Sequence, residues 1–279
     1  MQIALALVIS FAGLCLLVYF MQNRLVFRPF STLEADPSAF GLPFEDVRHM
    51  AEDGTRIHAW YIPGKAEGGG AGLSGVFCHG NAGNLSHILE TMRILRELGM
   101  DMLYFDYRGY GESEGSPDEE GVAMDARAAY DWLVCEKGAD PRRVVAWGRS
   151  LGGAVASRLA VEREVGALVL ETAFTSIPEI GSHMYPLLPA RWLATIKLPT
   201  IEYVRRVRAP VLVAHGAGDE TVPYAMGRKL FAAANEPKTF LELAGGHNDF
   251  FLAMGEDYAA GVERFLETLP RPEARDRNR

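Results

Sequence analysis

The chain opens on a long apolar segment. From Gln2 to Met21 only Gln2 and Ser10 interrupt the apolar pattern, and the next polar residue is Gln22. About twenty helical residues span ~30 Å, which matches the hydrocarbon core of a bilayer. The pattern predicts a single transmembrane anchor over residues 2–22.

A cleaved signal peptide is the alternative interpretation of this segment. It fits less well, because no Lys or Arg precedes the apolar residues and no site of small residues follows them. Arg24 and Arg28 come just after the segment, and the positive-inside rule then keeps the rest of the chain in the cytoplasm. We therefore expect a single-pass membrane protein whose folded part lies in the cytoplasm.

After a connector over residues 23–43, the hydrophobic positions follow the periods of an α/β protein. Residues 44–50 and 57–62 alternate in polarity around Asp53-Gly54, which favours a tight turn, so they predict an antiparallel hairpin. Beyond a glycine-rich loop, short apolar runs alternate with helical patterns, as in a mostly parallel sheet with helices on both faces. The expected strands are residues 74–79, 102–106, 143–147, 167–170, 210–215 and 238–243, and the expected helices are residues 85–98, 119–136, 151–162, 224–234 and 249–268.

One segment breaks this alternation. Residues 174–206 carry four prolines and an apolar run from Met184 to Leu193, which predicts a small cap inserted over the sheet. The run has two interpretations: packing against the sheet, which we favour, or a surface for an acyl chain or lipid. The folded domain then covers residues 44–269, and residues 270–279 form a charged tail that we expect to be disordered.

A candidate nucleophile lies between a predicted strand and a predicted helix. Residues 148–152 read Gly-Arg-Ser-Leu-Gly, the pattern of a nucleophile elbow in its required context. A serine on such a sharp turn has a strained backbone, and its neighbours one turn away must lack a Cβ atom. Ser150 would then project at a helix N-terminus, where free N–H groups favour developing negative charge.

A serine hydroxyl needs a base, normally a histidine held by a carboxylate. In α/β enzymes with a nucleophile elbow, the triad residues follow one another along the chain in the order serine, acid, histidine. Asp219 follows an apolar strand, and His247 is the one histidine beyond it. We predict Ser150, Asp219 and His247 as a catalytic triad.

Three other acidic residues compete for the role of the acid. Glu220 is adjacent to Asp219, and Glu171 ends another predicted strand, where a structural hydrogen-bonding role fits better. Asp249 precedes an apolar helical pattern and is expected to cap that helix. Asp219 is our first choice.

The remaining requirement is a pair of donors for an oxyanion. The backbone N–H groups of Asn81, which follows a predicted strand, and Leu151 are the candidates. His79 precedes the serine in the chain, so we interpret it as a buried structural residue.

Several motifs in order along the chain resemble a known family. They are His-Gly-Asn-Ala-Gly at 79–83, Phe-Asp-Tyr-Arg-Gly-Tyr-Gly at 105–111, Gly-Arg-Ser-Leu-Gly at 148–152, Glu-Thr-Ala-Phe-Thr-Ser at 171–176 and Gly-Gly-His at 245–247. With the anchor, they look like α/β-hydrolases of the membrane-anchored Bem46-like group, over about residues 24–269. The resemblance implies the α/β-hydrolase fold, the same triad and the same oxyanion donors, and it implies little about substrate.

Composition excludes several functions. The net charge of -8 argues against nucleic acid as a partner, because such binding draws on Lys and Arg. Residues 109–115 have the wrong glycine spacing for a dinucleotide loop. No metal-ligand motif is present, so we expect neither a metal nor a cofactor. Three cysteines give no disulfide framework, and we expect Cys78 and Cys135 to be small core residues.

These patterns together predict a serine hydrolase that acts on a small-molecule acyl substrate. The anchor and the apolar cap favour an ester or thioester with a hydrophobic, lipid-like acyl group, with a peptide bond as the second choice. Acyl transfer to an alcohol or thiol, and a catalytically silent membrane-tethered module, are the remaining alternatives. The fold by itself does not choose between them.

Overall fold

A single twisted sheet forms the centre of the protein. The computed structural model describes residues 1–248 and 255–270, and within them eight strands pair in the order β10-β9-β8-β7-β4-β6-β3-β2. The strands are β2 (Glu45–Met50), β3 (Arg56–Ile62), β4 (Ser74–Cys78), β6 (Asp101–Phe105), β7 (Val144–Arg149), β8 (Ala167–Glu171), β9 (Val211–Gly216) and β10 (Lys238–Leu243).

The strand directions confirm the predicted mixed sheet. The hairpin β2-β3 is antiparallel and joins the sheet through β6, which is also antiparallel to β3. From β6 to β10 all neighbouring strands are parallel. Each of these strands begins and ends within two residues of its predicted bounds.

The parallel strands are apolar throughout because both faces of the sheet are covered. Alternate residues belong to two separate hydrophobic clusters: Val144 and Ala146 of β7 pack in the first, whereas Val145 and Trp147 pack in the second. Side chains of successive strand residues point to opposite faces. The sheet therefore separates two core layers.

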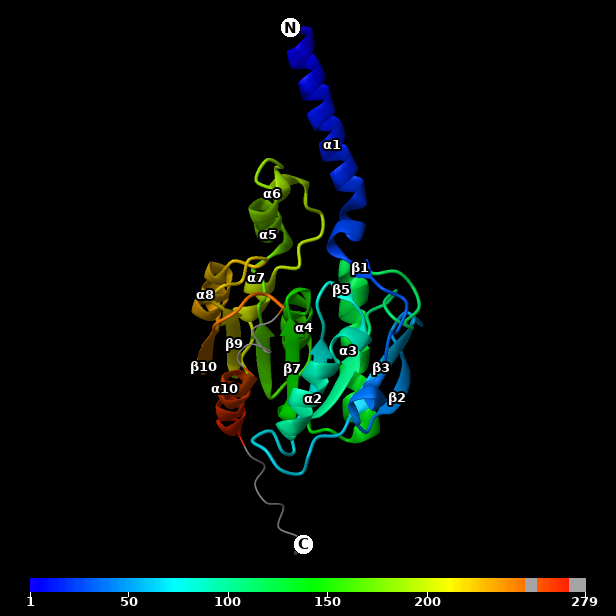
Figure 1. Ribbon diagram of the computed structural model, residues 1–279, viewed down its shortest axis with the longest axis vertical. Helices are drawn as coiled ribbons and strands as arrows, with labels where there is room; N and C mark the ends of the chain where they lie inside the picture. Colours follow the sequence, from blue (N-terminus) through cyan, green and yellow to red (C-terminus); the bar gives the residue numbers. More distant parts are fainter. Residues whose placement is uncertain (249–254, 271–279) are drawn as a thin grey trace, which may run out of the picture.

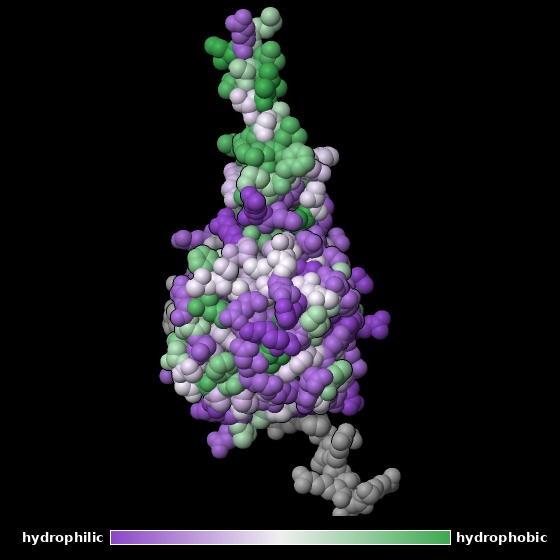
Figure 2. Space-filling view, turned by 90° about the vertical axis from the view of Figure 1, so that its right-hand side faces the viewer, coloured by the Kyte–Doolittle hydropathy of each residue, from purple (hydrophilic) through white to green (hydrophobic). Residues whose placement is uncertain are grey.

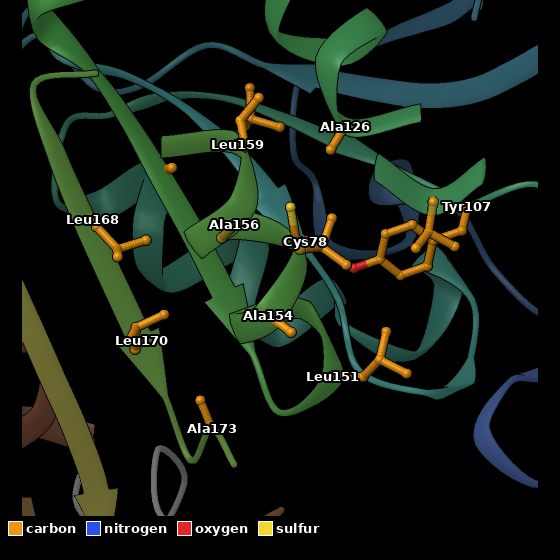
Figure 3. Close-up of a cluster of buried hydrophobic side chains, with 14 of the residues drawn as sticks. Cys78, Tyr107, Ala126, Leu151, Ala154, Ala156, Leu159, Leu168, Leu170 and Ala173 are labelled. Atoms are coloured by element: carbon orange, nitrogen blue, oxygen red, sulfur yellow. The ribbon is translucent and has the colours of Figure 1, made fainter. Parts of the chain in front are cut away.

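Helices cover each layer. On the first face lie α3 (Glu119–Lys137), α4 (Leu151–Glu162), α7 (Thr200–Val204) and α8 (Tyr224–Ala233), and on the second lie α2 (Leu89–Glu97) and α10 (Gly255–Glu267). Figure 1 shows α4 in front of β7 near the middle of the sheet. Figure 3 shows small and branched side chains of α4 facing those of β8, which allows the helix to approach the strand closely; the labelled ones include Ala154, Ala156, Leu159, Leu168 and Leu170.

Two local features differ from the predicted elements. Residues 85–98 form two pieces, the 3₁₀ helix η2 (Leu85–His87) and α2, because the backbone of Ile88 between them is not helical, with φ -120° and ψ 19°. Two further 3₁₀ helices, η1 (Pro37–Phe40) and η3 (Pro141–Arg143), lie in connections. Residues 249–254 lie outside the described part, and with them the predicted Asp249 cap and the first turns of the last helix.

The N-terminal segment forms α1 (Gln2–Val26), which continues past the predicted end at residue 22. No proline or glycine follows Gln22 until Pro29, so nothing in the backbone ends the helix where the apolar pattern ends. Among the described residues α1 is the helix long and apolar enough to cross a membrane. It rises away from the sheet, and Figure 2 shows it as a mostly hydrophobic column above a largely hydrophilic surface.

The predicted cap contains α5 (Ile177–Met184) and α6 (Ala190–Leu193), and it lies at the same end of the molecule as α1 (Figure 1). Packing of its apolar run against the sheet, the interpretation we favoured, is wrong. Leu187 and Trp192 are 87% and 89% exposed, and Met184 and Tyr185 are also exposed, because α5 and α6 project beyond the sheet edge. The run is a surface, not a part of the core.

Of the two cysteines predicted as core residues, one is buried and the other is exposed. Cys78 is fully buried in the first cluster, as expected. Cys135 is exposed, and its prediction as a core residue is wrong: Leu133 carries the buried face of α3 in this turn, and a residue two positions along a helix points away from that face.

His49 makes the stability of the fold depend on pH. The side chain is buried in β2, and neither ring nitrogen has a hydrogen-bond partner among the described residues. Burial, with a smaller contribution from the nearby His58, lowers the pKa of His49 from 6.5 to about 4. As the pH falls through this interval, the unfolded chain binds a proton that the folded chain does not, so the free energy of unfolding decreases.

We expect His49→Phe to weaken this pH dependence. Between pH 6.5 and about 4 the variant should lose less free energy of unfolding than the wild-type protein, by up to about 3 kcal/mol. Urea unfolding of the detergent-solubilised full chain at several pH values measures the difference. Parallel pH profiles for the two proteins would contradict the assignment.

Candidate active site

Ser150 lies on a sharp turn between β7 and α4. Its backbone has φ 54° and ψ -117°, a strained conformation for a residue with a side chain. The backbone N–H of Ser150 donates to the carbonyl of Glu171 at 2.8 Å, which anchors the turn to β8. The elbow predicted from the glycine spacing is therefore present.

The two flanking glycines permit this turn sterically. A Cβ atom on Gly148 would lie 2.2 Å from the carbonyl oxygen of Gly152, and one on Gly152 would lie 1.9 Å from the carbonyl oxygen of Cys78. Both contacts are with backbone, which cannot move aside without displacing α4 in the first case or β4 in the second. Glycine is the residue that fits at each position.

Loops from the end of the sheet bring the three predicted triad residues together. The imidazole Nε2 of His247 lies 3.1 Å from Oγ of Ser150, and its Nδ1 lies 2.8 Å from Oδ2 of Asp219. Asp219 follows β9 and His247 follows β10, so both loops leave the carboxyl edge of the parallel strands. The fold thus brings Ser150 and His247 into contact although 97 positions separate them in the sequence.

Asp219 is held as a carboxylate. Its Oδ1 accepts the backbone N–H groups of Thr221 and Val222 at 2.9 and 2.7 Å, and Nε2 of His215 lies 3.4 Å from Oδ2. Burial by itself would raise the pKa of Asp219, but the hydrogen bonds from His215 and His247 outweigh it and hold this pKa well below its usual range. The group is thus ionised at neutral pH. His215 was not predicted, since its proximity to Asp219 arises from the turn after β9.

The competing acids lie in different environments. Glu171 is fully buried and accepts hydrogen bonds from Trp147 Nε1 at 2.8 Å, Arg149 Nε at 2.6 Å and the Tyr258 hydroxyl. These donors occupy both carboxylate oxygens, as expected for a structural hydrogen-bonding residue. Glu220 is exposed. His79 is buried as predicted, with Nδ1 2.8 Å from the carbonyl of Gly80.

Asn81 and Leu151 line the same cavity as Ser150 and His247. Leu151 is the first residue of α4, where the backbone N–H groups have no partner within the helix. Asn81 follows β4 in the loop on the other side of Ser150. Their N–H groups as oxyanion donors stay a prediction.

A short parallel pair, absent from the predicted elements, fixes the loop around Asn81. Strand β1 (Arg28–Pro29) pairs with β5 (Ala82–Gly83), and the carbonyl of Asn81 accepts the N–H of Arg28 at 3.0 Å and the Tyr110 hydroxyl at 2.8 Å. Strands of two residues leave no trace in hydrophobic periodicity. The chain leaving α1 is therefore tied directly to the candidate oxyanion loop.

The cavity at Ser150 has a volume of about 390 Å³ and mostly apolar walls. One wall comes from the cap and the other from the end of α1, which sequence patterns do not place together. The apolar lining residues from these two elements include Val18, Leu25, Val26, Ile177, Ile180, Met184, Leu188 and Leu193.

Comparison with known proteins agrees with this architecture. The family model for the alpha/beta hydrolase fold matches residues 76–196. An uncharacterized protein of Mycobacterium tuberculosis is 42% identical over 91% of this chain and 90% of its own length. The alpha/beta hydrolase domain-containing protein WAV2 of Arabidopsis thaliana is 37% identical over 92% of this chain and 90% of its own length.

A third relative has a named activity. The lysophosphatidylserine lipase ABHD12 of Macaca fascicularis is 37% identical, over 59% of this chain and 46% of its own length. Among solved structures, an esterase of Pyrococcus furiosus, Pf2001, superimposes with a TM-score of 0.72 at 20% identity, covering 88% of this chain and 99% of that one. At this identity the likeness is one of fold.

We expect Gly152→Ala to disrupt the elbow. The added methyl group would collide with the Cys78 carbonyl, so the start of α4 must move away from β4, at a cost of about 2 kcal/mol or more in the free energy of unfolding. The midpoint temperature of thermal unfolding and the extent of labelling by a fluorophosphonate probe should both decrease. Gly255→Ala is the control, because a Cβ atom there would meet no atom of the described residues within 4 Å. Equal stability of the two variants would contradict the steric argument.

Proposed function

The chain belongs to the α/β-hydrolase family, and on that premise we propose that it is a serine hydrolase that cleaves a carboxylic ester through an acyl-enzyme. The supporting observation is the imidazole of His247, placed between the hydroxyl of Ser150 and the carboxylate of Asp219 at hydrogen-bonding distances. The name of one relative, a lysophosphatidylserine lipase, favours esters over other acyl compounds. A thioester has the same acyl chemistry.

In the first half of the reaction Ser150 Oγ attacks the ester carbonyl while His247 Nε2 takes the hydroxyl proton. Asp219 accepts a hydrogen bond from Nδ1 of His247 and stabilises the imidazolium that forms. The negative charge on the former carbonyl oxygen is stabilised by the N–H groups of Asn81 and Leu151. His247 then donates its proton to the departing alkoxide, and the alcohol leaves.

In the second half, water replaces the alcohol. His247 removes a proton from the water as it attacks the acyl-serine carbonyl, and then returns the proton to Ser150 Oγ. The products are a carboxylic acid and the free enzyme. The apolar walls of the cavity supply a binding site for the acyl group rather than for a polar peptide.

We also propose that α1 is a retained membrane anchor. Its end is part of the folded structure: Phe27 is buried, and Gln22 donates to the carbonyl of Leu193 in the cap at 3.0 Å. Removal of α1 would take away one wall of the cavity at Ser150. Arg24 and Arg28, which flank the apolar span, favour a cytoplasmic position for the catalytic domain.

Ser150→Ala should abolish hydrolysis of short p-nitrophenyl esters and labelling by a fluorophosphonate probe, because the nucleophile is lost. Asp219→Asn should lower kcat by about 10³- to 10⁴-fold, since an amide no longer stabilises the imidazolium or its productive tautomer. Steady-state kinetics with the full chain in detergent measures both effects.

Glu220→Gln is the matched control for the acid, because it removes a carboxylate one residue away that is exposed. Its kcat should stay within about twofold of the wild-type value. Full activity in Asp219→Asn, or Ser150-independent hydrolysis, would refute the proposed triad.

The membrane proposal predicts a defined topology. Expressed in a Gram-negative host, the full chain should stay in the membrane fraction after carbonate extraction. A C-terminal alkaline phosphatase fusion should be inactive, since that enzyme folds only in an oxidising compartment, whereas a C-terminal fluorescent-protein fusion should be bright. An active phosphatase fusion would contradict the proposed orientation and place the catalytic domain outside the cytoplasm.

A further inference from the structure

One face of α1 is set apart from the rest of the helix. Gln22 is buried and Cys15, Val18 and Val26 are half-buried, whereas most other residues of the helix are exposed. Their spacing of three to four residues places these four on one side of the helix. That side contacts the cap, because α1 and α6 pack together and Val18, Gln22 and Val26 line the cavity. The remaining faces of the apolar segment are open.

Gln22 fastens this face to the cap. Its Nε2 donates to the carbonyl oxygens of Leu193 and Tyr19 at 3.0 and 2.9 Å, and its Oε1 accepts from the N–H of Thr195 at 2.6 Å and the hydroxyl of the same residue at 3.1 Å. Gln22 is 8% exposed, and the donor and acceptor atoms of its amide both have partners. The hydrogen bonds of Gln22 therefore join the wall that the cap forms to the wall that α1 forms.

The cavity runs from the triad toward the apolar segment of α1. Its lining includes Ser150 and His247 as well as Val18, Leu25 and Val26 of α1. Between Val26 and Val18 the helix rises by about 12 Å, so the lined channel follows α1 in the direction of its membrane-spanning part. A volume of about 390 Å³ is near the lower end of the range for single-ligand pockets, roughly 300 to 1,000 Å³, and suits one acyl chain rather than two.

The outer surface of the cap continues the apolar surface of the helix. Leu187 and Trp192 are almost fully exposed, and the cap carrying them stands beside α1 at one end of the molecule (Figure 1). Exposed tryptophan and leucine beside a membrane-spanning helix are typical of contact with the headgroup region of a bilayer. The cavity thus opens where protein and membrane meet.

We propose that the substrate is a single-chain lipid ester that resides in the bilayer, and that its acyl chain enters the site laterally, between α1 and the cap. This inference rests on the proposed esterase function and adds the substrate class and its route. The carbonyl lies at Ser150, the chain lies along Val18, Leu25 and Val26, and the leaving alcohol faces the aqueous side.

The test compares Val18→Trp with Leu17→Trp in the full chain reconstituted in phosphatidylcholine vesicles. Val18 lines the cavity, whereas Leu17, its neighbour, is 55% exposed and is not part of the lining. The two variants place the same tryptophan side chain at adjacent positions of the same helix. The measured quantity is the ratio of kcat/KM for a long-chain monoacylglycerol in the vesicles to kcat/KM for p-nitrophenyl acetate in water.

Val18→Trp should lower this ratio by about tenfold or more, because the indole fills the path of the chain. Leu17→Trp should leave the ratio at the wild-type value. Equal ratios in the two variants, with both substrates hydrolysed, would overturn the lateral route while leaving the esterase function in place. A wild-type protein that hydrolyses neither substrate would instead refute the proposed function.

A second measurement does not depend on turnover. Ser150→Ala protein in vesicles is irradiated with a single-chain lipid that carries a diazirine on its acyl chain, and the crosslinked peptides are identified by mass spectrometry. The proposal expects crosslinks to the segments 18–26 and 177–193, reduced in Val18→Trp. Crosslinks confined to the exposed face of α1, as for any surrounding lipid, would overturn it.

Discussion

The architecture of this protein depends on a backbone contact at the start of α4. The carbonyl of Cys78 lies so close to Gly152 that no side chain fits between them. Because glycine has no Cβ atom, α4 can approach the centre of the sheet this closely. Ser150 then adopts a strained conformation that the neighbouring strand β8 stabilises through the Glu171 carbonyl. In this conformation the Ser150 hydroxyl points toward the loops that carry the base and the acid.

Hydrogen bonds among buried polar side chains stabilise the turn at Ser150. The carboxylate of Glu171 accepts hydrogen bonds from Trp147, Arg149 and Tyr258, which come from β7, the residue before the nucleophile and α10. Arg149 also donates to Thr91 of α2 at 3.0 Å. A buried carboxylate with these donors ties elements of the second core layer to the elbow, so the position of Ser150 reflects contacts on both faces of the sheet.

The N-terminal helix is structurally continuous with the site. Its last residues lead into β1, which pairs with the loop of Asn81, and its Gln22 side chain binds the cap. A helix that served only as a tether would need neither contact. The candidate anchor thus helps to shape the cavity in which the acyl chemistry is proposed, and a change in the position of α1 relative to the cap would change the walls of that cavity.

The sequence by itself determined the sheet, its covering helices, the elbow and the three residues of the candidate triad. These follow from local rules: alternating or continuous apolar runs define strands, and glycines around a serine between a strand and a helix define the turn. Only the tertiary structure decided that His215 supports Asp219, that β1 holds the Asn81 loop, that the cap exposes Leu187 and Trp192, and that Val18 lines the cavity. Each of these is a contact or an exposure set by segments far apart in the chain, and hydrophobic periodicity records which side of an element is apolar but not what lies against that side.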